Sequence, residues 1–243
     1  MSNDAQFGKP EGEAGEELID AMDISHTPVS LWSLTNLEVN EDDVTLDIGC
    51  GSGLNIKRLY EKSPKAKSYG VDYSSTCVKK SKQLNKELVE SGDVEVYEAN
   101  VLDMPFEDET FNIITAFETV YFWPDIVDSF KEVKLTLKDD GKFFIVMDAN
   151  GCYAPELEEI TKEENCIFYT DEQLKDILFD ADFSKVTSII RKREKDQKCV
   201  KKWTKNDCCK KLVDDNYPED KFTEYSEDGF PNSPEWYCII AEK

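Results

Sequence analysis

The stretch Asp47-Ile48-Gly49-Cys50-Gly51-Ser52-Gly53 decides how this sequence folds. It begins inside the apolar run 44–48, which predicts a buried strand, and it precedes a helix predicted over residues 54–61. Glycine has no Cβ, so three glycines at alternate positions permit a sharp turn and a close approach of the backbone to a ligand. The following helix offers free backbone N–H groups suited to a carboxylate or a phosphate. This order of elements is typical of the ligand-binding edge of an α/β sheet.

Strands and helices alternate along the rest of the chain. Apolar runs predict strands at residues 68–72, 94–97, 111–116, 142–147, 184–190 and 236–241. Helices are predicted at residues 75–91, 126–137 and 171–180, with Thr170 capping the last of them. Repeated strand–helix units predict a parallel sheet with helices on both faces.

The 243 residues are expected to form one α/β domain over residues 18–243, with additions at its ends. Residues 1–17 are poor in large apolar side chains and are predicted to be a mobile acidic tail. Residues 18–40 are predicted to be N-terminal lid helices, divided into two at Pro28. The Lys/Asp-rich stretch 191–235 is predicted to be an insertion, a surface excursion before the last strand.

The composition excludes several classes of function. The net charge is −23, from 52 acidic and 29 basic residues, which disfavours a nucleic acid or an anionic lipid surface as the partner. The sequence contains no apolar run of membrane-spanning length, and its first residues lack the features of a signal peptide, so a soluble cytoplasmic protein is expected. The eight cysteines are expected to be reduced thiols. Their only cluster is Cys199 with Cys208 and Cys209, and because no Cys-x-x-Cys pair occurs, no metal site is predicted.

The acidic residues around the glycines indicate the charge of the ligand. A dinucleotide fingerprint needs its third glycine at position 54, which is Leu54 here. Asp47 would oppose a pyrophosphate but could pair with the ammonium group of an amino-acid ligand. Asp72, at the end of the second predicted strand, can accept hydrogen bonds from both hydroxyls of a ribose. These groups favour a ligand with an ammonium group and a ribose.

With these features, the sequence resembles the class I S-adenosylmethionine-dependent methyltransferases. The resemblance is carried by Asp47–Gly53, Asp72-Tyr73, Met104-Pro105-Phe106 and Asp140-Gly141-Lys142-Phe143, and it covers roughly residues 40–190 and the last strand. The most similar branch is the small-molecule one that includes the menaquinone and ubiquinone C-methyltransferases. The resemblance implies a Rossmann-like sheet of seven strands, mostly parallel, with an antiparallel last strand. It also implies S-adenosyl-L-methionine as the cofactor and S-adenosyl-L-homocysteine as the product.

The resemblance further implies which residues bind the cofactor. The glycine loop would surround the methionine part, Asp47 would reach its amino group, Asp72 would hold the ribose, and Tyr73 could pack on the adenine. The loop at 100–102 would meet the edge of the adenine, and its Asn100 stands where many relatives have Asp. The implied set is Asp47, Gly49, Cys50, Gly51, Gly53, Asp72, Tyr73, Asn100, Val101, Leu102 and Phe117. Cys50 is interpreted as a small loop residue, and Asn100 as either a ligand contact or a turn former.

The methyl acceptor is predicted to be a small molecule. The Asn/Asp-Pro-Pro-Tyr motif of nucleic-acid amino methyltransferases is absent after the fourth strand, and so is the paired-glutamate loop of protein arginine methyltransferases. Candidate catalytic residues are His26, Glu118 and Tyr121, and Trp32 and Trp123 could line the acceptor pocket. Asp148 is a weaker candidate for the rim of the pocket. For each of them a purely structural role remains an alternative, and for Trp32 anchoring of the lid is favoured over lining the pocket.

Three other functions are open from the sequence alone. The chain could be an NAD-dependent oxidoreductase, against which Leu54 argues, or a protein that binds S-adenosylmethionine without catalysis. Methylation of a soft metalloid or a thiol, with Cys199, Cys208 and Cys209 involved, is a marginal third reading. The oligomeric state and the acceptor atom are not determined by the sequence.

Overall fold

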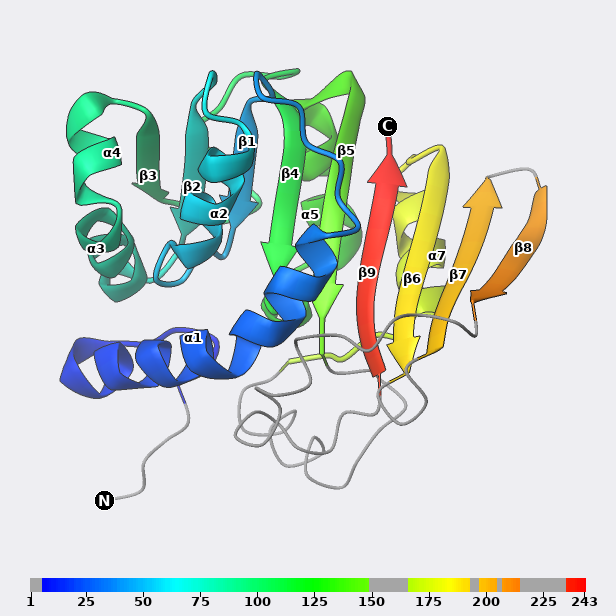
Figure 1. Ribbon diagram of the computed structural model, residues 1–243, viewed down its shortest axis with the longest axis horizontal. Coiled ribbons are helices and arrows are strands. Elements are labelled where there is room, and N and C mark those ends of the chain that lie inside the picture. The colour runs from blue at the N-terminus through cyan, green and yellow to red at the C-terminus, as the bar shows by residue number, and fades with distance from the viewer. Residues whose placement is uncertain (1–5, 149–165, 193–196, 205–206, 215–234) are drawn as a thin grey trace.

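The computed structural model describes residues 6–148, 166–192, 197–204, 207–214 and 235–243 (Figure 1). Within these residues, nine strands form one sheet in the order β3-β2-β1-β4-β5-β9-β6-β7-β8. The strands are β1 (Thr45–Ile48), β2 (Ser68–Asp72), β3 (Val94–Glu98), β4 (Phe111–Phe117), β5 (Leu137–Met147), β6 (Lys185–Lys192), β7 (Gln197–Thr204), β8 (Asp207–Asp214) and β9 (Glu235–Glu242).

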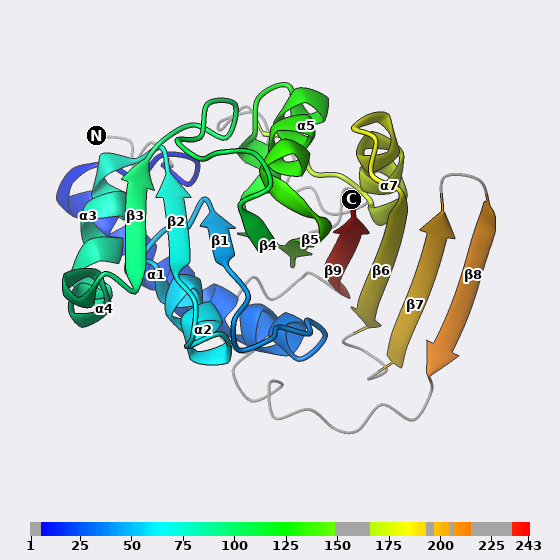
Figure 2. The same ribbon diagram turned by 90° about the horizontal axis from the view of Figure 1, so that it is seen from above.

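Helices lie on both faces of this sheet. Figure 2 shows α1 and α2 on one side of the strands and α5 and α7 on the other. The helices are α1 (Gly12–Leu34), α2 (Leu54–Lys62), α3 (Ser75–Leu84), α4 (Lys86–Ser91), α5 (Ile126–Thr136) and α7 (Asp171–Asp180), and a short 3₁₀ helix, η1, covers Val120–Phe122. Within the part of the chain that the structure describes, no helix has both the length and the apolarity to span a membrane.

The Rossmann-like architecture predicted from the sequence is confirmed. Strands β3, β2, β1, β4 and β5 pair in parallel, and the last strand, β9, runs antiparallel to β5. Strand β2 and helix α7 have the predicted bounds. Residues 137–141, which precede the predicted strand 142–147, belong to β5. There the pairing partner in β5 moves from Leu137 to Lys142 while β4 advances only from Phe111 to Ile113, so the pairing is irregular.

The sheet is two strands wider than predicted, because the stretch expected to be a surface excursion contains β7 and β8. These strands pair antiparallel to β6 and to each other, and they extend the sheet beyond the helices in Figure 2. Their many lysines and aspartates argued against a buried strand, but charged side chains are common on strands at the edge of a sheet. Composition alone was therefore a poor guide here, and residues 215–234 of the predicted insertion lie outside the described part.

Helix α1 corrects two predictions about the N-terminus. It begins at Gly12, inside the stretch 1–17 predicted to be a tail, and it continues through Pro28 instead of dividing there. Proline removes one backbone hydrogen bond and tends to kink a helix, and Figure 1 shows that α1 changes direction along its length. The helix is continuous because its C-terminal half is buried, with Val29 and Trp32 packed against the sheet. This packing outweighs the lost hydrogen bond.

The helix predicted over residues 75–91 is divided into α3 and α4 at Asn85. The side-chain amide of Asn85 donates hydrogen bonds to the carbonyls of Gly53 and Ser81, both at 3.0 Å. Asn85 is buried and has a backbone conformation outside the helical region, with φ −98° and ψ 24°. Its side chain therefore links the end of α3 to the glycine loop, and this long-range contact has no local sequence signal.

Helix α7 begins with the predicted cap, and this gives a first testable result. The Thr170 hydroxyl accepts a hydrogen bond from the Gln173 N–H at 3.1 Å, and the Gln173 side chain accepts one from the Thr170 N–H at 2.9 Å. Replacing Thr170 with alanine leaves a helix N–H without this partner, so the free energy of unfolding should fall by about 1 kcal/mol. Urea unfolding measures the change. Thr170→Ser, which keeps the hydroxyl, is the control, and equal stability of the alanine variant would contradict the role of the cap.

Candidate active site

The candidate site lies where the parallel strands end. The loops after β1, β2, β3, β4 and β5 emerge from the same edge of the sheet, since these strands run in the same direction. After β1 the chain forms β2 and β3 on one side of β1 in the sheet, and it then forms β4 and β5 on the opposite side of β1. In an open α/β sheet a ligand binds at this reversal of strand order.

The three glycines of the loop after β1 have positive φ angles, and each has a different environment. Gly49 has φ +71°, and a Cβ there would overlap the Thr119 hydroxyl and lie 2.8 Å from Thr119 Cβ. At Gly53, with φ +81°, a Cβ would lie 2.6 Å from the Asn85 amide nitrogen. Gly51 has φ +52°, and no atom lies within 4 Å of its Cβ position. The outer two glycines are therefore needed for packing, whereas Gly51 faces open space.

Asp72 fixes the shape of this loop. One oxygen of its carboxylate accepts a hydrogen bond from the Gly51 N–H and the other accepts one from the Ser74 N–H, both at 2.9 Å. Each oxygen retains a second lone pair for a ligand hydroxyl. Burial raises the pKa of Asp72, while the two backbone N–H groups oppose that rise. The sequence-based role of Asp72 as a hydrogen-bond acceptor for a ribose is compatible with this geometry.

Asp47 is a second buried carboxyl group beneath the loop. The Thr115 hydroxyl donates a hydrogen bond to it at 2.7 Å, and 1% of the Asp47 surface is exposed. Burial raises the pKa of Asp47 to about 7, and the nearby charge of Asp72 adds to this rise. The hydrogen bond from Thr115 and the positive charge of Arg58 partly oppose this rise. Two buried acidic groups beside an open glycine favour a ligand that carries positive charge.

The other predicted cofactor contacts differ in exposure. Tyr73 is exposed, and its hydroxyl donates a hydrogen bond to the Gly8 carbonyl, with Lys9 lying 5.6 Å from the centre of its ring. Leu102 is exposed, whereas Val101 and Phe117 are buried. The Asn100 side chain accepts a hydrogen bond from the Leu102 N–H at 3.0 Å, so it forms the turn, one of its two predicted roles.

Cys50 is a buried thiol, and its surroundings favour the reading as a small loop residue. Its sulfur lies 4.0 Å from the Ser81 hydroxyl. Burial, followed by the charges of Asp72 and Asp47, raises the pKa of the thiol well above its usual range. Only the thiolate is a strong nucleophile, so these surroundings disfavour nucleophilic chemistry at Cys50.

The N-terminal segment and α1 close one side of the site. The Ser52 hydroxyl donates a hydrogen bond to the Asp23 carboxylate at 2.8 Å, which links the glycine loop to α1. The Ser74 hydroxyl donates one to the Pro10 carbonyl at 2.6 Å. None of these contacts was predicted, because a short polar stretch before a helix gives no signal of what it touches. Such contacts are determined by the tertiary structure.

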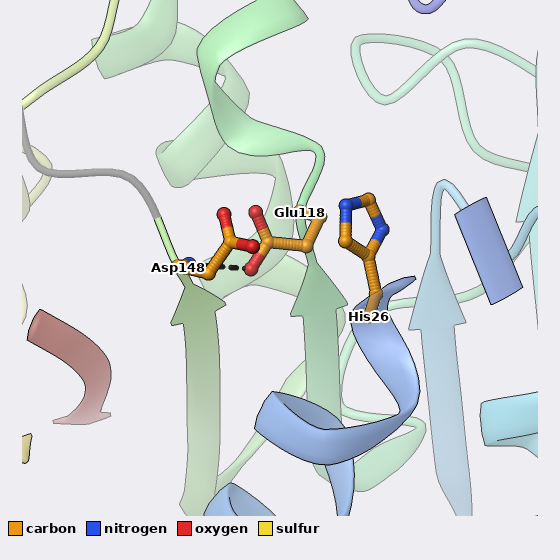
Figure 3. A group of neighbouring side chains, drawn as sticks. All are labelled: His26, Glu118 and Asp148. Atoms are coloured by element: carbon orange, nitrogen blue, oxygen red, sulfur yellow. Dashed lines mark hydrogen bonds between the residues drawn. The ribbon is translucent and has the colours of Figure 1, made fainter. Parts of the chain in front are cut away.

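Two of the predicted catalytic residues, His26 and Glu118, meet a third group, Asp148. Figure 3 shows the imidazole of His26 on one side of the Glu118 carboxylate and the carboxylate of Asp148 on the other. Glu118 follows β4 and has φ +54°, and it accepts a hydrogen bond from the Asp148 N–H at 2.6 Å. Ligand atoms of the three side chains lie within 4.8 Å of one another. Helix α1 and the ends of β4 and β5 thus converge on one cluster, which we call the His26–Glu118–Asp148 cluster.

The electrostatics of this cluster follow from burial. Burial, together with the neighbouring Asp148 carboxylate, holds the pKa of Glu118 well above its usual range. Burial lowers the pKa of His26, against the opposing charges of Asp148 and Asp23. Tyr121 donates a hydrogen bond to Glu118 at 3.3 Å, and burial raises the pKa of its phenol. A neutral imidazole beside carboxyl groups can accept a proton or bind a cation.

The two tryptophans named for the acceptor pocket differ in their surroundings. Trp32 has no exposed surface, and its ring lies 5.8 Å from the ring of Trp236, so it anchors α1 to the sheet instead of lining a pocket. Trp123 stacks on Phe143 at 6.0 Å, and its indole N–H donates to the Thr119 hydroxyl at 3.3 Å. The side chains of Cys199, Cys208 and Cys209 lie outside the described part of the chain.

Comparisons with known proteins agree with this geometry. Residues 46–145 match the family model described as a methyltransferase domain. The chain is 31% identical over 117 residues to the Bacillus subtilis protein YrhH, which is named as a methyltransferase. It is 34% identical over 105 residues to 2-phytyl-1,4-naphtoquinone methyltransferase of Trichormus variabilis. These alignments cover 48% and 43% of this chain, and only 64% and 46% of the relatives' own lengths.

A solved structure shows the same fold. Geranyl diphosphate C-methyltransferase from Streptomyces coelicolor A3(2), in complex with Mg²⁺, geranyl diphosphate and S-adenosyl-L-homocysteine, superposes with a TM-score of 0.63. The two sequences are 16% identical, and the superposition covers 98% of this chain and 86% of that one. At this identity the likeness concerns the fold alone.

Proposed function

We propose that this chain transfers a methyl group from S-adenosylmethionine to a small organic acceptor, because residues 46–145 match a methyltransferase-domain family and the relatives are named as methyltransferases. The observation that carries the proposal is the open position at Gly51, whose N–H donates to the buried Asp72 carboxylate, which in turn lies near the buried carboxyl group of Asp47. A ligand that fits there must bring an ammonium group and hydrogen-bond donors. S-adenosylmethionine has an ammonium group, a sulfonium charge and a ribose.

Each residue would have a defined role toward the cofactor. The loop Gly49–Gly53 would surround the methionine part, and Asp47 would pair with its amino group. Asp72 would accept hydrogen bonds from the ribose hydroxyls while it holds the Gly51 N–H. Tyr73 and Leu102, both exposed beside the site, would contact the adenine. When bound, the cofactor supplies a methyl group activated by a positively charged sulfur.

The protein's contribution to the reaction would be mainly alignment. Displacement at a methyl carbon is in-line, so holding the acceptor behind that carbon supplies most of the rate gain. The ends of β4 and β5, with α1 across them, would hold the acceptor, and they carry Glu118, Asp148 and His26. Glu118 or His26 would receive a proton where the acceptor must lose one. The buried ring of Tyr121, beside Glu118, would limit the access of water.

Two features favour a small molecule as the acceptor. The net charge of −23 disfavours a polyanionic substrate. The relatives include an enzyme named for a naphthoquinone and a structural neighbour solved with an isoprenoid diphosphate. We therefore propose small organic acceptors, with quinones and isoprenoids as the first to be tested.

Calorimetric titration and a transfer assay test the proposal together. The protein is titrated with S-adenosylmethionine, S-adenosylhomocysteine and NAD, and then incubated with S-adenosylmethionine labelled in its methyl group and a panel of acceptors. Binding of both adenosyl ligands, with label recovered in an acceptor, is the expected result. Binding of NAD in place of the adenosyl ligands would overturn the proposal in favour of an oxidoreductase. Binding without transfer to any acceptor would favour a non-catalytic binding protein.

The affinity for S-adenosylmethionine should depend on pH through Asp47. Its pKa in the folded protein is about 7, and the ligand's ammonium group pairs with the ionised carboxylate. Affinity should therefore fall as pH decreases through 7, by up to about tenfold per pH unit, because the protonated carboxyl group no longer attracts the ammonium. Calorimetry between about pH 6 and pH 7.5 measures the change, below the range where the ligand's own amino group loses its proton. Asp47→Asn should bind weakly and without this dependence; a flat profile for the unmodified protein would exclude the assigned role.

A further inference from the structure

We propose that His26, Glu118 and Asp148 form a binding site for one divalent transition-metal ion, such as Zn²⁺ or Mn²⁺. The donor set is one imidazole nitrogen and two carboxylate oxygens. Such mixed nitrogen and oxygen ligands suit these ions better than Mg²⁺ or Ca²⁺, which prefer oxygen alone. The sequence analysis predicts no metal site, because these ligands are 92 and 30 residues apart along the chain and no local motif joins them.

The geometry of the three side chains fits one ion. Their ligand atoms all lie within 4.8 Å of one another. Metal–ligand distances of about 2.0–2.2 Å place the ligands of one ion about 3–4 Å apart, so only small side-chain movements are needed. Figure 3 shows that the side chains of His26 and Asp148 lie on either side of Glu118 and come from three separate segments. Three protein ligands leave coordination positions open for a further ligand.

The burial of two acidic side chains favours a cation at the cluster. Glu118 and Asp148 are each only 8% exposed. Glu118 accepts hydrogen bonds from the Asp148 N–H and the Tyr121 hydroxyl, and a side-chain hydrogen bond joins the two carboxyl groups when one of them is protonated. Two ionised carboxylates this close in a poorly solvated place repel each other. A divalent cation between them would remove this repulsion.

The backbone at Glu118 is unusual in a way that serves such a site. Its φ of +54° is uncommon for a residue with a side chain, and it occurs at the first position after β4. Strained positions of this kind concentrate at ligand and catalytic sites. Here the conformation lets the carboxylate of Glu118 lie between the other two ligands.

The position of the ion would matter for the reaction. Thr119, the next residue, packs against Gly49, so the cluster adjoins the glycine loop. An ion with open coordination positions would hold an acceptor through an oxygen, nitrogen or sulfur atom beside the bound cofactor. This consequence for the acceptor rests on the proposed function, whereas binding of the ion does not.

The test is a metal titration of the full chain without cofactor. Metal is removed with a chelator, and Mn²⁺ is added at an ionic strength of about 0.15 M, at which weak binding to the acidic surface is screened. Electron paramagnetic resonance counts the bound ions. One tight ion per chain is expected, with affinity lowered at least about tenfold in Asp148→Asn and in His26→Gln. Asp108→Asn removes an exposed carboxylate elsewhere and should bind Mn²⁺ like the unmodified protein.

A spectroscopic signal identifies the ligands independently of affinity. The electron spin echo of the bound Mn²⁺ should show modulation from an imidazole nitrogen, and His26→Gln should remove it. No stoichiometric tight binding by the unmodified chain, or equal binding by Asp148→Asn and Asp108→Asn, would overturn the metal site. Because the cofactor is absent from this titration, failure here is distinct from failure of S-adenosylmethionine binding, which would overturn the proposed function alone.

Discussion

Replacing Asp72 with alanine is expected to weaken binding of S-adenosylmethionine and S-adenosylhomocysteine by about 100-fold or more. The carboxylate accepts hydrogen bonds from the Gly51 and Ser74 N–H groups, and it is proposed to accept two more from the ribose. Hydrogen bonds to a charged group contribute about 1.5–3 kcal/mol each, so the loss of two ribose contacts alone exceeds this factor. The variant also frees the Gly51 N–H, which loosens the loop around the methionine part.

Calorimetry of the Asp72 variants measures this effect. Asp72→Asn is the matched control, since it keeps one acceptor oxygen and the side-chain volume, and it should lie between the alanine variant and the unmodified protein. Urea unfolding of each variant separates a loss of binding from a loss of folding. Unchanged affinity in a folded Asp72→Ala protein would show that the ligand does not lie where the loop is open.

The second large effect is expected for Gly49→Ala. Alanine would have to adopt φ +71°, which costs about 1–2 kcal/mol for a residue with a Cβ. Its methyl group would also overlap the Thr119 hydroxyl, and overpacking of this kind costs about 1–3 kcal/mol more. The free energy of unfolding should therefore fall by about 2–5 kcal/mol, and ligand affinity should fall with it because the loop must shift.

The stability and the ligand affinity of Gly51→Ala can be compared directly with those of Gly49→Ala. The φ of Gly51 is +52°, but no atom lies within 4 Å of its Cβ position, so only the backbone cost of about 1–2 kcal/mol applies. Affinity for S-adenosylmethionine should nevertheless be lost, because the added methyl group occupies space proposed for the ligand. Denaturant unfolding and calorimetry on both variants give the two quantities. Equal stability losses in the two variants would contradict the packing at Gly49, and retained affinity in Gly51→Ala would contradict the ligand's position.

The sequence predicted the parts of the fold that local patterns determine. Strand β2 and helix α7 were predicted with their observed bounds, because a short apolar run and a capping box are both local signals. The glycine loop after β1 was predicted from three positions that require positive φ. Helix α1 was predicted to break at Pro28, yet burial of its second half keeps it continuous. Propensity is a weak prior when tertiary packing opposes it.

The candidate site was predictable only in part, because contacts between segments far apart in the sequence depend on the tertiary structure. The loop and Asp72 lie at strand ends that the pattern of elements locates. His26, Glu118 and Asp148 were each named, but their convergence depends on how α1 crosses the ends of β4 and β5. The contacts of Gly8 with Tyr73 and of Asp23 with Ser52 have no sequence signal at all. Short polar segments acquire partners only once the whole chain has folded.

The link between α1 and the glycine loop couples the loop to the His26–Glu118–Asp148 cluster. Asp23 and His26 are three residues apart on one helix, so they lie on neighbouring parts of its surface. Asp23 holds the loop through Ser52, while His26 reaches the cluster at the ends of β4 and β5. A displacement of the glycine loop on ligand binding would therefore be transmitted through Asp23 to His26, one turn further along α1. If the loop binds the proposed cofactor and the cluster the proposed acceptor, each ligand should then alter the affinity for the other, and by reciprocity by the same factor.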